Sequence, residues 1–427
     1  MYIRDLKLER FRGAHDLFLE LHEKLNVFVG VNGTGKSTVL DAAAILLSWL
    51  VNRIKSAGAS GRPITENDIE NGQFTSNLSI SLEASDAEAR CSWNIAKTKR
   101  EYNKKDVVSA LKLLSETAKR MQERLSDSMG LENIPLFAYY PVNRVVLDIP
   151  LRIRQRHRSD LLSAYDDALV SGANFRTFFE WFREREDLEN ENQLDAKPNL
   201  KAQGVSFPDP QLEAVRKVLT QFMPEFSNLR VRRSPLRMEI EKQGKRLTVN
   251  QLSHGEKCLM AMIGDMARRM AIANPLRENP LEGEGVFLID EIDLHLHPRW
   301  QHMIVSRLGT VFPNCQFLIS THSPHVVTHV LPESLFLLDM AEEGLRFYRS
   351  SHSYGKTAER VLEDLMGLET TRPDEITIAL EEIYSLIDKG DYAEARRSID
   401  ALRERIGGDS ELVKAAVLIK RKELIGK

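Results

Sequence analysis

A glycine-rich segment near the start of the chain has the residue types that bind phosphate. Gly30-Val-Asn-Gly-Thr-Gly-Lys-Ser37 follows an apolar run and opens into a second apolar stretch. This order of strand, glycine-rich loop and helix is the one that a phosphate-binding loop requires. Its glycines let successive backbone N–H groups turn toward an anion, and the helix N-terminus adds partial positive charge. The alternative is an ordinary glycine-rich turn, which the flanking elements disfavour.

The lysine and serine that end this segment would complete a triphosphate site. Lys36 would reach the outer phosphates as a point charge, and the Ser37 hydroxyl would hold Mg²⁺. We therefore expect ATP and Mg²⁺ to bind here. The predicted nucleotide-binding residues of the segment are Gly30, Asn32, Gly33, Thr34, Gly35, Lys36, Ser37 and Thr38.

Two further apolar runs end in residues that suit phosphate chemistry. One ends in Asp290 and Glu291, and the other ends in His322. Ligands of parallel α/β sheets bind at the carboxyl ends of the strands, so these side chains would meet the loop there. Asp290 would complete the Mg²⁺ shell with Ser37, and Glu291 would orient and deprotonate the attacking water. His322 would sense the γ-phosphate, although solvated strand ends are the simpler alternative for all three.

Composition limits the class of protein. The chain has 427 residues, a hydrophobic fraction of 42% and a net charge of −3, which predict two or three structural units in a globular protein. Its three cysteines are scattered and form no ligand pair, which argues against structural zinc. We recognise no signal-peptide core and no apolar run of the ~20 residues that span a bilayer. A cytoplasmic location without a membrane partner is expected.

The hydrophobic pattern predicts the elements that must position these residues. Three short strands are expected within 2–29, and an antiparallel hairpin with one solvated face is expected at 77–83 and 91–95. Asp106 would cap an amphipathic helix that reaches residue 128. The remaining predicted strands lie near 134–144, 229–233, 236–240, 246–249, 285–289 and 316–320. The remaining predicted helices lie near 159–170, 175–190, 211–223, 254–273, 357–366, 373–389, 392–406 and 410–424.

Two basic segments lie outside the phosphate motifs. Four arginines alternate with other residues and would share one face of a strand: Arg152, Arg154, Arg156 and Arg158. They would contact a phosphate backbone or an acidic partner, or form ion pairs within the chain. The segment 97–105 is also basic, and a solvated turn is the favoured interpretation.

One more motif gives the chain a family resemblance. Leu252-Ser253-His254-Gly255-Glu256 resembles the signature motif of ABC ATPases. Together with Phe11-Arg12-Gly13 and the motifs above, it makes residues 1 to about 340 similar to an ABC-type ATPase head of the SMC/RecF kind. The resemblance implies an α/β fold with a mixed sheet and helices. It also implies that the chain hydrolyses ATP.

The resemblance also assigns roles to individual residues. It implies a homodimer in which Ser253, Gly255 and Glu256 of one subunit close over the nucleotide of another. His254 stands where glycine is usual, which bears on how closely the backbone approaches phosphate there. Arg12 would lie near the base side of the nucleotide. The loop that usually contacts Mg²⁺ through a glutamine has no clear match, and Asn143 with Arg144, or Gln73, are the candidates.

The chain resembles one group of such ATPases more specifically, the Septu and retron-associated anti-phage ATPases. The segments that carry this resemblance are 139–144, 175–183, 293–301 and 390–395. It implies an HNH-type nuclease as partner and, in retrons, a reverse transcriptase with its RNA–DNA product. It makes 293–297 a loop that touches its twin across the dimer, which we favour over a metal site at His295 and His297. The alternatives are a DNA-repair or chromosome-maintenance ATPase that binds DNA itself, and a scaffold in which nucleotide only holds a dimer.

These motifs suggest four parts. We expect a first ATPase lobe at 1–100, an inserted helical lobe at 101–228, a second ATPase lobe at 229–345 and an all-α C-terminal extension at 346–427. The insert is too short for coiled-coil arms, because a helix over 106–128 spans only about 35 Å. The extension would cap the core or provide a docking platform for an effector.

Overall fold

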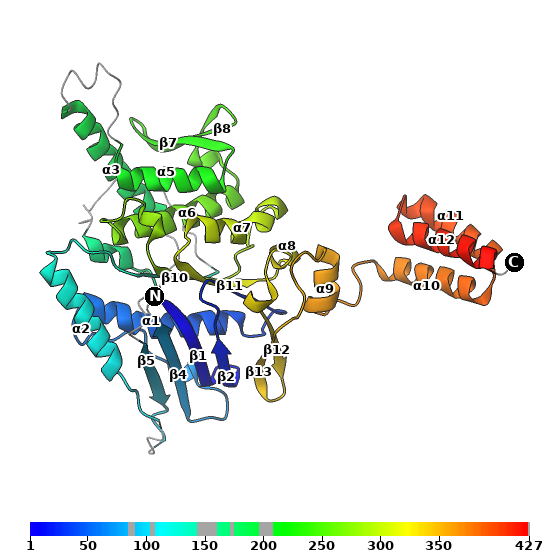
Figure 1. Ribbon diagram of the computed structural model, residues 1–427, viewed down its shortest axis with the longest axis horizontal. Coiled ribbons are helices and arrows are strands. Elements are labelled where there is room, and N and C mark those ends of the chain that lie inside the picture. Colours follow the sequence, from blue (N-terminus) through cyan, green and yellow to red (C-terminus); the bar gives the residue numbers. More distant parts are fainter. Residues whose placement is uncertain (84–89, 103–106, 143–159, 171–174, 196–207, 426–427) are drawn as a thin grey trace. The chain divides into compact units, whose positions relative to one another are not determined.

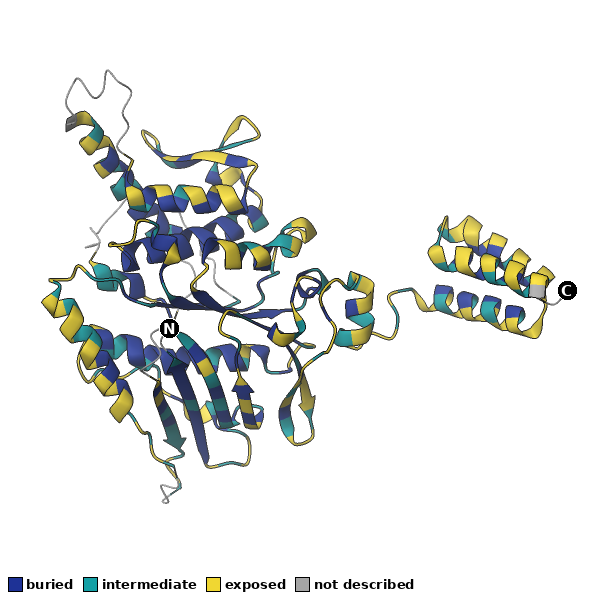
Figure 2. Ribbon diagram, viewed as in Figure 1, coloured by how far each residue is buried: buried dark blue, intermediate teal, exposed yellow. Residues whose placement is uncertain are grey.

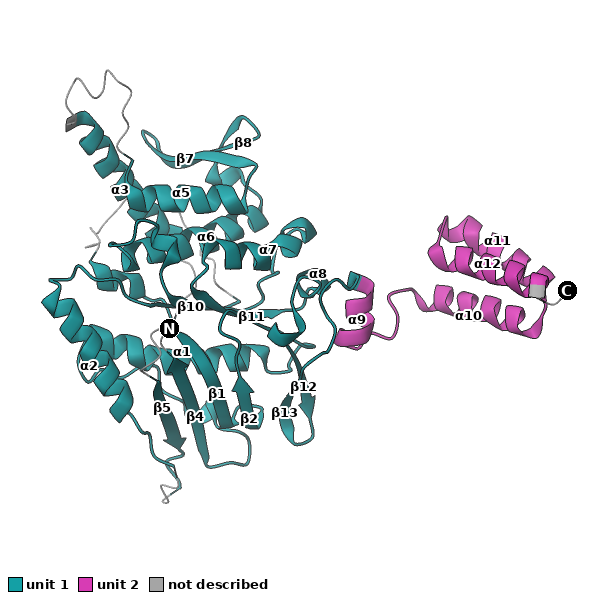
Figure 3. Cartoon of the chain, viewed as in Figure 1, with its two compact units in different colours: residues 1–358 teal, residues 359–427 magenta. Residues whose placement is uncertain are grey.

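The computed structural model describes residues 1–83, 90–102, 107–142, 160–170, 175–195 and 208–425. The chain divides into two compact units, Met1–Ala358 and Glu359–Lys427 (Figure 3). The predicted helical extension therefore separates near residue 358. The predicted division of the preceding part into three lobes stays a prediction.

A six-stranded mixed sheet forms the centre of the first unit (Figure 1). Its strand order is β13-β12-β3-β11-β10-β6, and only the pairing of β13 with β12 is antiparallel. The strands are β3 (Leu25–Val29), β6 (Leu136–Tyr140), β10 (Gly285–Ile289), β11 (Cys315–Thr321), β12 (Leu335–Ala341) and β13 (Gly344–Tyr348). The central strands are apolar runs because helices or a second sheet cover both faces. The predicted α/β fold with a mixed sheet is confirmed.

The second sheet is antiparallel, with the order β2-β1-β4-β5. Its strands are β1 (Tyr2–Phe11), β2 (Ala14–Glu20), β4 (Thr75–Glu83) and β5 (Cys91–Thr98). The predicted hairpin forms, but the expectation of one solvated face is wrong for β4, whose residues are nearly all buried. Hydrogen bonds satisfy its polar side chains: Asn77 donates to Glu9 at 2.6 Å, and Ser81 donates to Asp5 at 2.8 Å.

Helix α1 (Lys36–Lys55) contacts strands of both sheets, which explains its apolar surface. It is the one helix of the described part that is long and apolar enough to cross a membrane, and 67% of that window is buried inside the protein. On the other side of the central sheet, α6 (His254–Ala273) contacts β6, α3 (Phe175–Asp195) and α5 (Pro210–Phe222). Helices α7 (Pro298–Val311) and α8 (Pro324–Val327) flank β11 along the chain.

Two predicted helices differ from the structure. The helix expected from residue 106 begins later, as α2 (Lys112–Asp127), and Asp106 lies outside the described residues. Residues 109 and 110 bond to β5 instead: Ala110 bridges to Asn94, and the Ser109 hydroxyl accepts from the Ala96 N–H at 2.9 Å. The helix expected at 159–170 is only the 3-10 turn Leu161–Tyr165, because Arg269 of α6 bonds to the carbonyl of Ala164 within it and Tyr139 of β6 bonds to the carbonyl of Ala168 after it.

A third sheet precedes α6. It consists of β7 (Phe226–Arg233), β8 (Leu236–Lys242) and β9 (Lys245–Thr248), paired antiparallel in that order. The three strands confirm the pattern predicted for this segment.

The second unit is helical, as predicted. Its helices are α9 (Ala358–Met366), α10 (Asp374–Lys389), α11 (Tyr392–Ile406) and α12 (Ser410–Ile425). The last three share an apolar core that includes Ile383, Ile399 and Ile419. Gly390 ends α10 in a left-handed conformation (φ +81°), which a residue with a side chain adopts at a cost.

A buried charged network ties α6 to the central sheet. Asp265 accepts hydrogen bonds from Tyr140 of β6 at 3.0 Å and from Arg268 and Arg269 at 2.7 Å. Burial alone would raise the pKa of Asp265, but the two guanidinium groups outweigh it and hold that pKa below its usual value. Arg269 also donates to the carbonyl of Ala164 at 2.7 Å.

Replacing Asp265 tests this network. Asp265→Asn should lower the free energy of unfolding by about 3–5 kcal/mol, because it leaves two buried arginines without a counter-charge. Urea unfolding of the full chain, followed by circular dichroism, measures the change. Glu123→Gln, which removes an exposed ion pair with Lys119, should change it by less than about 0.5 kcal/mol. Equal effects of the two substitutions would contradict the proposed importance of the network.

Candidate nucleotide-binding site

The glycine-rich loop connects β3 to α1 at the carboxyl edge of the central sheet. Gly33 and Gly35 have φ values of +85° and +79°, where glycine is favoured. At Gly30 a Cβ atom would lie 2.5 Å from the carbonyl oxygen of Leu338. The loop therefore needs glycine at all three positions, for backbone conformation at two and for space at the third.

Lys36 is buried at the start of α1. Its Nζ donates to the carbonyl oxygens of Gly30 at 2.9 Å and Val31 at 2.8 Å, so the side chain folds back over the loop. Burial lowers the pKa of Lys36, and the carboxylates of Asp290 and Glu291 oppose that shift. A phosphate bound in the loop would favour the charged ammonium further.

Strand β10 delivers two carboxylates to the same edge. Asp290 is buried and accepts a hydrogen bond from the Ser320 hydroxyl at 2.5 Å. The same hydroxyl oxygen accepts from the backbone N–H of Glu291 at 2.7 Å. Glu291 has a φ of +46°, a strained conformation for a residue with a side chain. Ser320 on the neighbouring strand β11 thus fixes the position of both acids.

A third acid holds the end of β11. Asp293 accepts from the Thr321 hydroxyl at 2.6 Å and from the backbone N–H of His322 at 3.3 Å. Burial and the nearby charge of Lys36 keep the pKa of His322 below its usual value, against the effect of the acids. This shift favours the neutral imidazole, which can donate one ring N–H to a phosphate oxygen.

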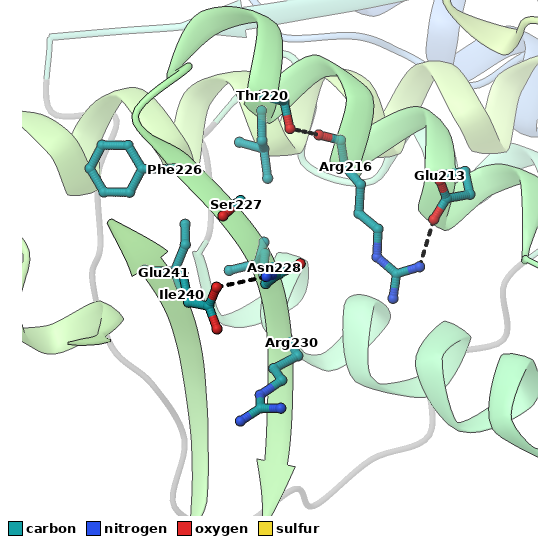
Figure 4. A pocket seen from close by; sticks show the side chains of 11 residues that line it. Glu213, Arg216, Thr220, Phe226, Ser227, Asn228, Arg230, Ile240 and Glu241 are labelled. Carbon is teal, nitrogen blue, oxygen red and sulfur yellow. Dashed lines mark hydrogen bonds and ion pairs between the residues drawn. The ribbon is translucent and has the colours of Figure 1, made fainter. Parts of the chain in front are cut away.

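One cavity of about 350 Å³ brings these groups together. The loop, Glu291 and His322 line it with Gly13 and with two residues of the β12–β13 hairpin, Met340 and Leu345. Three other cavities are larger and contain none of these residues. Two, of about 540 Å³ (Figure 4) and 890 Å³, lie against α5, and one of about 360 Å³ lies beside β4, β5 and the start of α2. We therefore place the candidate site at the smaller cavity, where a triphosphate could lie beside both strand ends.

The donors at this edge suit Mg²⁺. A serine hydroxyl and a carboxylate are oxygen ligands, and Mg²⁺ is commonly held by one or two such groups together with substrate phosphates. In the described part of the chain, no group of three His, Cys, Asp or Glu side chains could hold a metal without such help. Ser37 and Asp290 are therefore the residues that fit the ion.

Arg12 and the signature residues do not line the cavity. Arg12 donates to Asp41 at 2.6 Å and to Asp68 at 2.9 Å, beside the cavity residue Gly13. Ser253 is exposed at the start of α6, where it and Glu256 form a reciprocal capping box. Glu256 also accepts from Lys242 at 2.5 Å. The expected contacts of these residues with nucleotide stay predictions.

The remaining predicted positions fall in three groups. Gln73 lies in the turn before β4 and does not line the cavity. His297 caps α7 through its Nδ1, and His295 packs edge-on against His254 at 4.5 Å between ring centroids. The other predicted residues lie outside the described part of the chain: Asn143, Arg144, Arg152, Arg154, Arg156 and Arg158.

The sequence did not predict the part that four residues play in this site, although it placed Asp293 in a loop expected at the dimer contact. Ser320 and Asp293 position the acids and His322, and Met340 and Leu345 add an apolar wall. The spacing of Asp293 after Asp290, and the polar residues at 320–323, were available signals. Nothing in the sequence pattern connects the β12–β13 hairpin with the glycine-rich loop.

The signature segment also contacts the loop 293–297 within one chain. A Cβ atom on Gly255 would lie 2.2 Å from the carbonyl oxygen of His295, closer than any real contact. Gly255→Ala should therefore displace this loop and lower the free energy of unfolding by about 1–3 kcal/mol. Urea unfolding measures the shift.

Gly309 provides the matched control, because it lies inside α7 and a Cβ atom there would have no neighbouring atom within 4 Å. Gly309→Ala should raise the free energy of unfolding by about 0.4–1 kcal/mol. A Gly255→Ala variant as stable as Gly309→Ala would show that the close approach to His295 is wrong.

Comparisons with known proteins show which family the chain resembles. Residues 25–328 match the family model described as "AAA domain, putative AbiEii toxin, Type IV TA system". The retron Ec83 probable ATPase of Escherichia coli is 30% identical over 96% of this chain and 84% of that protein. The retron Vc95 probable ATPase of Vibrio cholerae serotype O1 biovar El Tor is 29% identical over 91% and 84%. Septu protein PtuA of Bacillus thuringiensis is 25% identical over 91% and 90%.

Solved structures give a weaker likeness. The SMC head domain from Thermotoga maritima is 13% identical, with a TM-score of 0.45 over 82% of this chain and 100% of that one. The fold assignment rests on the strand order described above. The family model covers most of the chain, and the Escherichia coli relative covers nearly all of it. The chain therefore belongs to this AAA domain family, in the group of ATPases that includes the retron Ec83 probable ATPase.

Proposed function

We propose that the chain is a cytoplasmic ATPase that hydrolyses ATP between two copies of itself and thereby regulates a partner effector in an anti-phage defence system. The observation that carries this proposal is the single cavity lined by the glycine-rich loop, Glu291 and His322. A lysine, a strand-end acid and a neutral imidazole around one triphosphate-sized space are the groups that phosphoryl transfer to water uses.

The residues that line the cavity and the neighbouring strand ends have distinct roles. Lys36 and the backbone N–H groups of the loop bind the outer phosphates, while Ser37 and Asp290 would hold Mg²⁺. When bound, Mg²⁺ would neutralise charge that develops on the phosphate oxygens. Glu291 orients the attacking water and accepts its proton, and His322 donates a hydrogen bond to the γ-phosphate. Ser320 and Asp293 keep these side chains in place through the hydrogen bonds described above.

The dimer proposal is supported by the surface of the signature segment. Ser253 and His254 are exposed at the start of α6 and do not line the cavity of their own chain. A helix N-terminus with an exposed serine suits the γ-phosphate of a second subunit's nucleotide. Arg12 would lie on the base side, next to Gly13.

The partner proposal is supported by the relatives. Two of them are named as ATPases of retrons and one as a Septu protein. We propose an HNH-type nuclease as the regulated effector and, in a retron, a reverse transcriptase with its RNA–DNA product. An ATPase rate that duplex DNA raises in the absence of any partner would favour a DNA-repair role instead.

Lys36→Ala tests nucleotide binding. The dissociation constant for a fluorescent ATP analogue should rise by about 100-fold, because a charge-assisted contact to phosphate is lost. Equilibrium titration measures it. The control is Lys55→Ala at the other end of α1, where the ammonium pairs with Asp166 on the surface. Unchanged ATP affinity of the Lys36→Ala protein would exclude this loop as the site.

Glu291→Gln tests hydrolysis and assembly together. The turnover number should fall by about 10²–10⁴-fold, because the amide cannot accept the proton of the water. ATP affinity should stay unchanged, so ATP-bound dimers should accumulate in sedimentation experiments. Glu343→Gln, on the exposed turn of the β12–β13 hairpin, serves as control. Normal turnover in Glu291→Gln would mean that another residue positions the water.

A further inference from the structure

Buried and exposed residues both occur along β7 (Figure 2), and the strand pairing of the β7–β8–β9 sheet places apolar side chains on one face and charged side chains on the other. Leu229, Val231, Met238 and Ile240 are buried on the first face. On the other face, cross-strand pairs join Arg230 to Glu239, Arg232 to Arg237 and Glu241 to Arg246. We call this second face the arginine face: Arg230, Arg232, Arg237, Glu239, Glu241 and Arg246.

The arginine face has more positive than negative charge. Glu239 is buried beneath its neighbours and accepts two hydrogen bonds from Arg230, at 2.9 and 3.3 Å. It also pairs with Arg237 at 2.7 Å, and Arg232 approaches it only to 3.8 Å. Four arginines against two glutamates leave an excess of two positive charges on the face.

Neighbouring acids do not cancel this excess. Glu186 and Asp187 of α3 pair with Arg233, whose side chain starts from the other side of the strand. Glu225 pairs with Arg299 at 3.1 Å. Glu213, which shares a cavity with Arg230, pairs with Arg216 at 2.7 Å. These acids are engaged with other arginines, so the charge of the arginine face stays unbalanced.

The arginines also retain unused hydrogen-bond donors. A guanidinium has five N–H groups, and Arg230 directs two of them to Glu239. Arg232 directs its Nε to the carbonyl of Ser234, and Arg246 reaches Glu241 only at 3.8 Å. The side chains of Arg230, Arg232, Arg237 and Arg246 are 46%, 50%, 37% and 56% exposed.

The pairing of Arg232 with Arg237 points to an anion. Like charges directly opposite each other in an antiparallel pair are destabilising. The Glu239 carboxylate lies 2.7 Å from Arg237 and 3.8 Å from Arg232, but it also pairs with Arg230 and so balances one of three positive charges. A further anion would relieve the remaining repulsion, and phosphate accepts two parallel hydrogen bonds from one guanidinium. Several such groups on a flat sheet suit a ligand with many phosphates.

The residue types of the face indicate which polyanion fits. All of residues 226–248 are described, and none of them is an exposed aromatic or large apolar side chain. Sites for single strands stack bases on aromatic side chains, and protein interfaces are enriched in aromatic residues and methionine. An antiparallel β-ribbon of arginines is instead suited to the backbone and groove of a duplex. We propose that the arginine face binds duplex nucleic acid through its phosphate backbone.

The arginine face is separate from the candidate nucleotide cavity, whose lining contains none of its residues. Arg230 also borders the 540 Å³ cavity beside α5, where the Asn228 amide donates a hydrogen bond to Glu241 at 2.7 Å (Figure 4). Arg216 on the opposite wall is already paired with Glu189 and Glu213, so the cavity adds no free cation.

Charge reversal at the edge of the face tests the proposal. Arg232→Glu combined with Arg246→Glu changes the two arginines whose nitrogens lie farthest from a glutamate oxygen, at 3.8 Å each. Glu239 therefore keeps its ion pairs with Arg230 and Arg237. Fluorescence anisotropy with a duplex of about 30 bp and arbitrary sequence, between about 50 and 200 mM salt, measures affinity of the full chain. The double variant should bind at least about tenfold more weakly. The slope of log K against log salt should become shallower by about 2, since about 0.9 is lost for each phosphate contact.

Arg396→Glu combined with Arg403→Glu is the matched control, with the same change in net charge on surface arginines of α11. It should bind the duplex like the unmodified chain. If circular dichroism shows that the arginine-face variant is unfolded, Arg232→Gln with Arg246→Gln replaces it. The slope of log K against log salt should then change in the same direction. Lys36→Ala should retain duplex binding, which separates this site from the nucleotide cavity.

Several results would overturn the proposal. One is equal binding by the arginine-face variant and the unmodified chain, and another is an equal loss in the control. Tighter binding of a single strand than of the duplex would point to a different surface. Displacement of the duplex by polyglutamate at equal charge concentration would identify an acidic protein as the ligand. Parallel titrations with DNA, RNA and RNA–DNA duplexes identify which backbone is bound.

Discussion

The parallel pairing of β3, β11 and β10 is the constraint on which the candidate site depends. Thr321 pairs with Val29, and Ile319 pairs with Ile289, so the three strands end at one edge of the sheet. The glycine-rich loop, Glu291 and His322 follow directly after these ends. A shift of one residue in either pairing would turn the apolar side chains of a strand to the opposite face and move its functional residue away from the cavity.

Hydrogen bonds of Ser320 and Asp293 fix the positions of the residues at these strand ends. The Ser320 hydroxyl bonds both to Asp290 and to the backbone of Glu291, across the β10–β11 pair. Asp293, which follows β10, accepts hydrogen bonds from the Thr321 hydroxyl and the His322 N–H at the end of β11. The loop that contains Asp293 also contacts Gly255 of the signature segment through His295. Contacts through Asp293 and His295 thus connect the nucleotide cavity with the signature segment, the surface that we propose meets a second subunit.

Most of the fold could be predicted from the sequence where the pattern is local and strong. The apolar strands, α1 and the tail helices have clear periodicity, and the glycine-rich loop has few alternatives. The predicted start of α2 near residue 106 was wrong because residues 109 and 110 bond to β5. Hydrophobic periodicity does not indicate hydrogen bonds to a neighbouring strand. The predicted helix at 159–170 was wrong for a similar reason, since hydrogen bonds from β6 and from Arg269 fix that segment.

The site was predicted less completely than the fold. Residues at strand ends could be found because apolar runs end in polar ones, as at Asp290 and His322. Met340 and Leu345 could not, because only the three-dimensional contact of the β12–β13 hairpin with the loop brings them there.

The central claim is that ATP is hydrolysed between two copies of the chain, with the loop from one and the signature from the other. Mixing two inactive variants tests it directly: Lys36→Ala has an intact signature, and Ser253→Arg has an intact loop. Random exchange should restore about a quarter of the unmodified ATPase rate, because half of the dimers are mixed and each holds one complete site. Ser253→Arg that is fully active by itself, or mixed dimers without any activity, would contradict the claim.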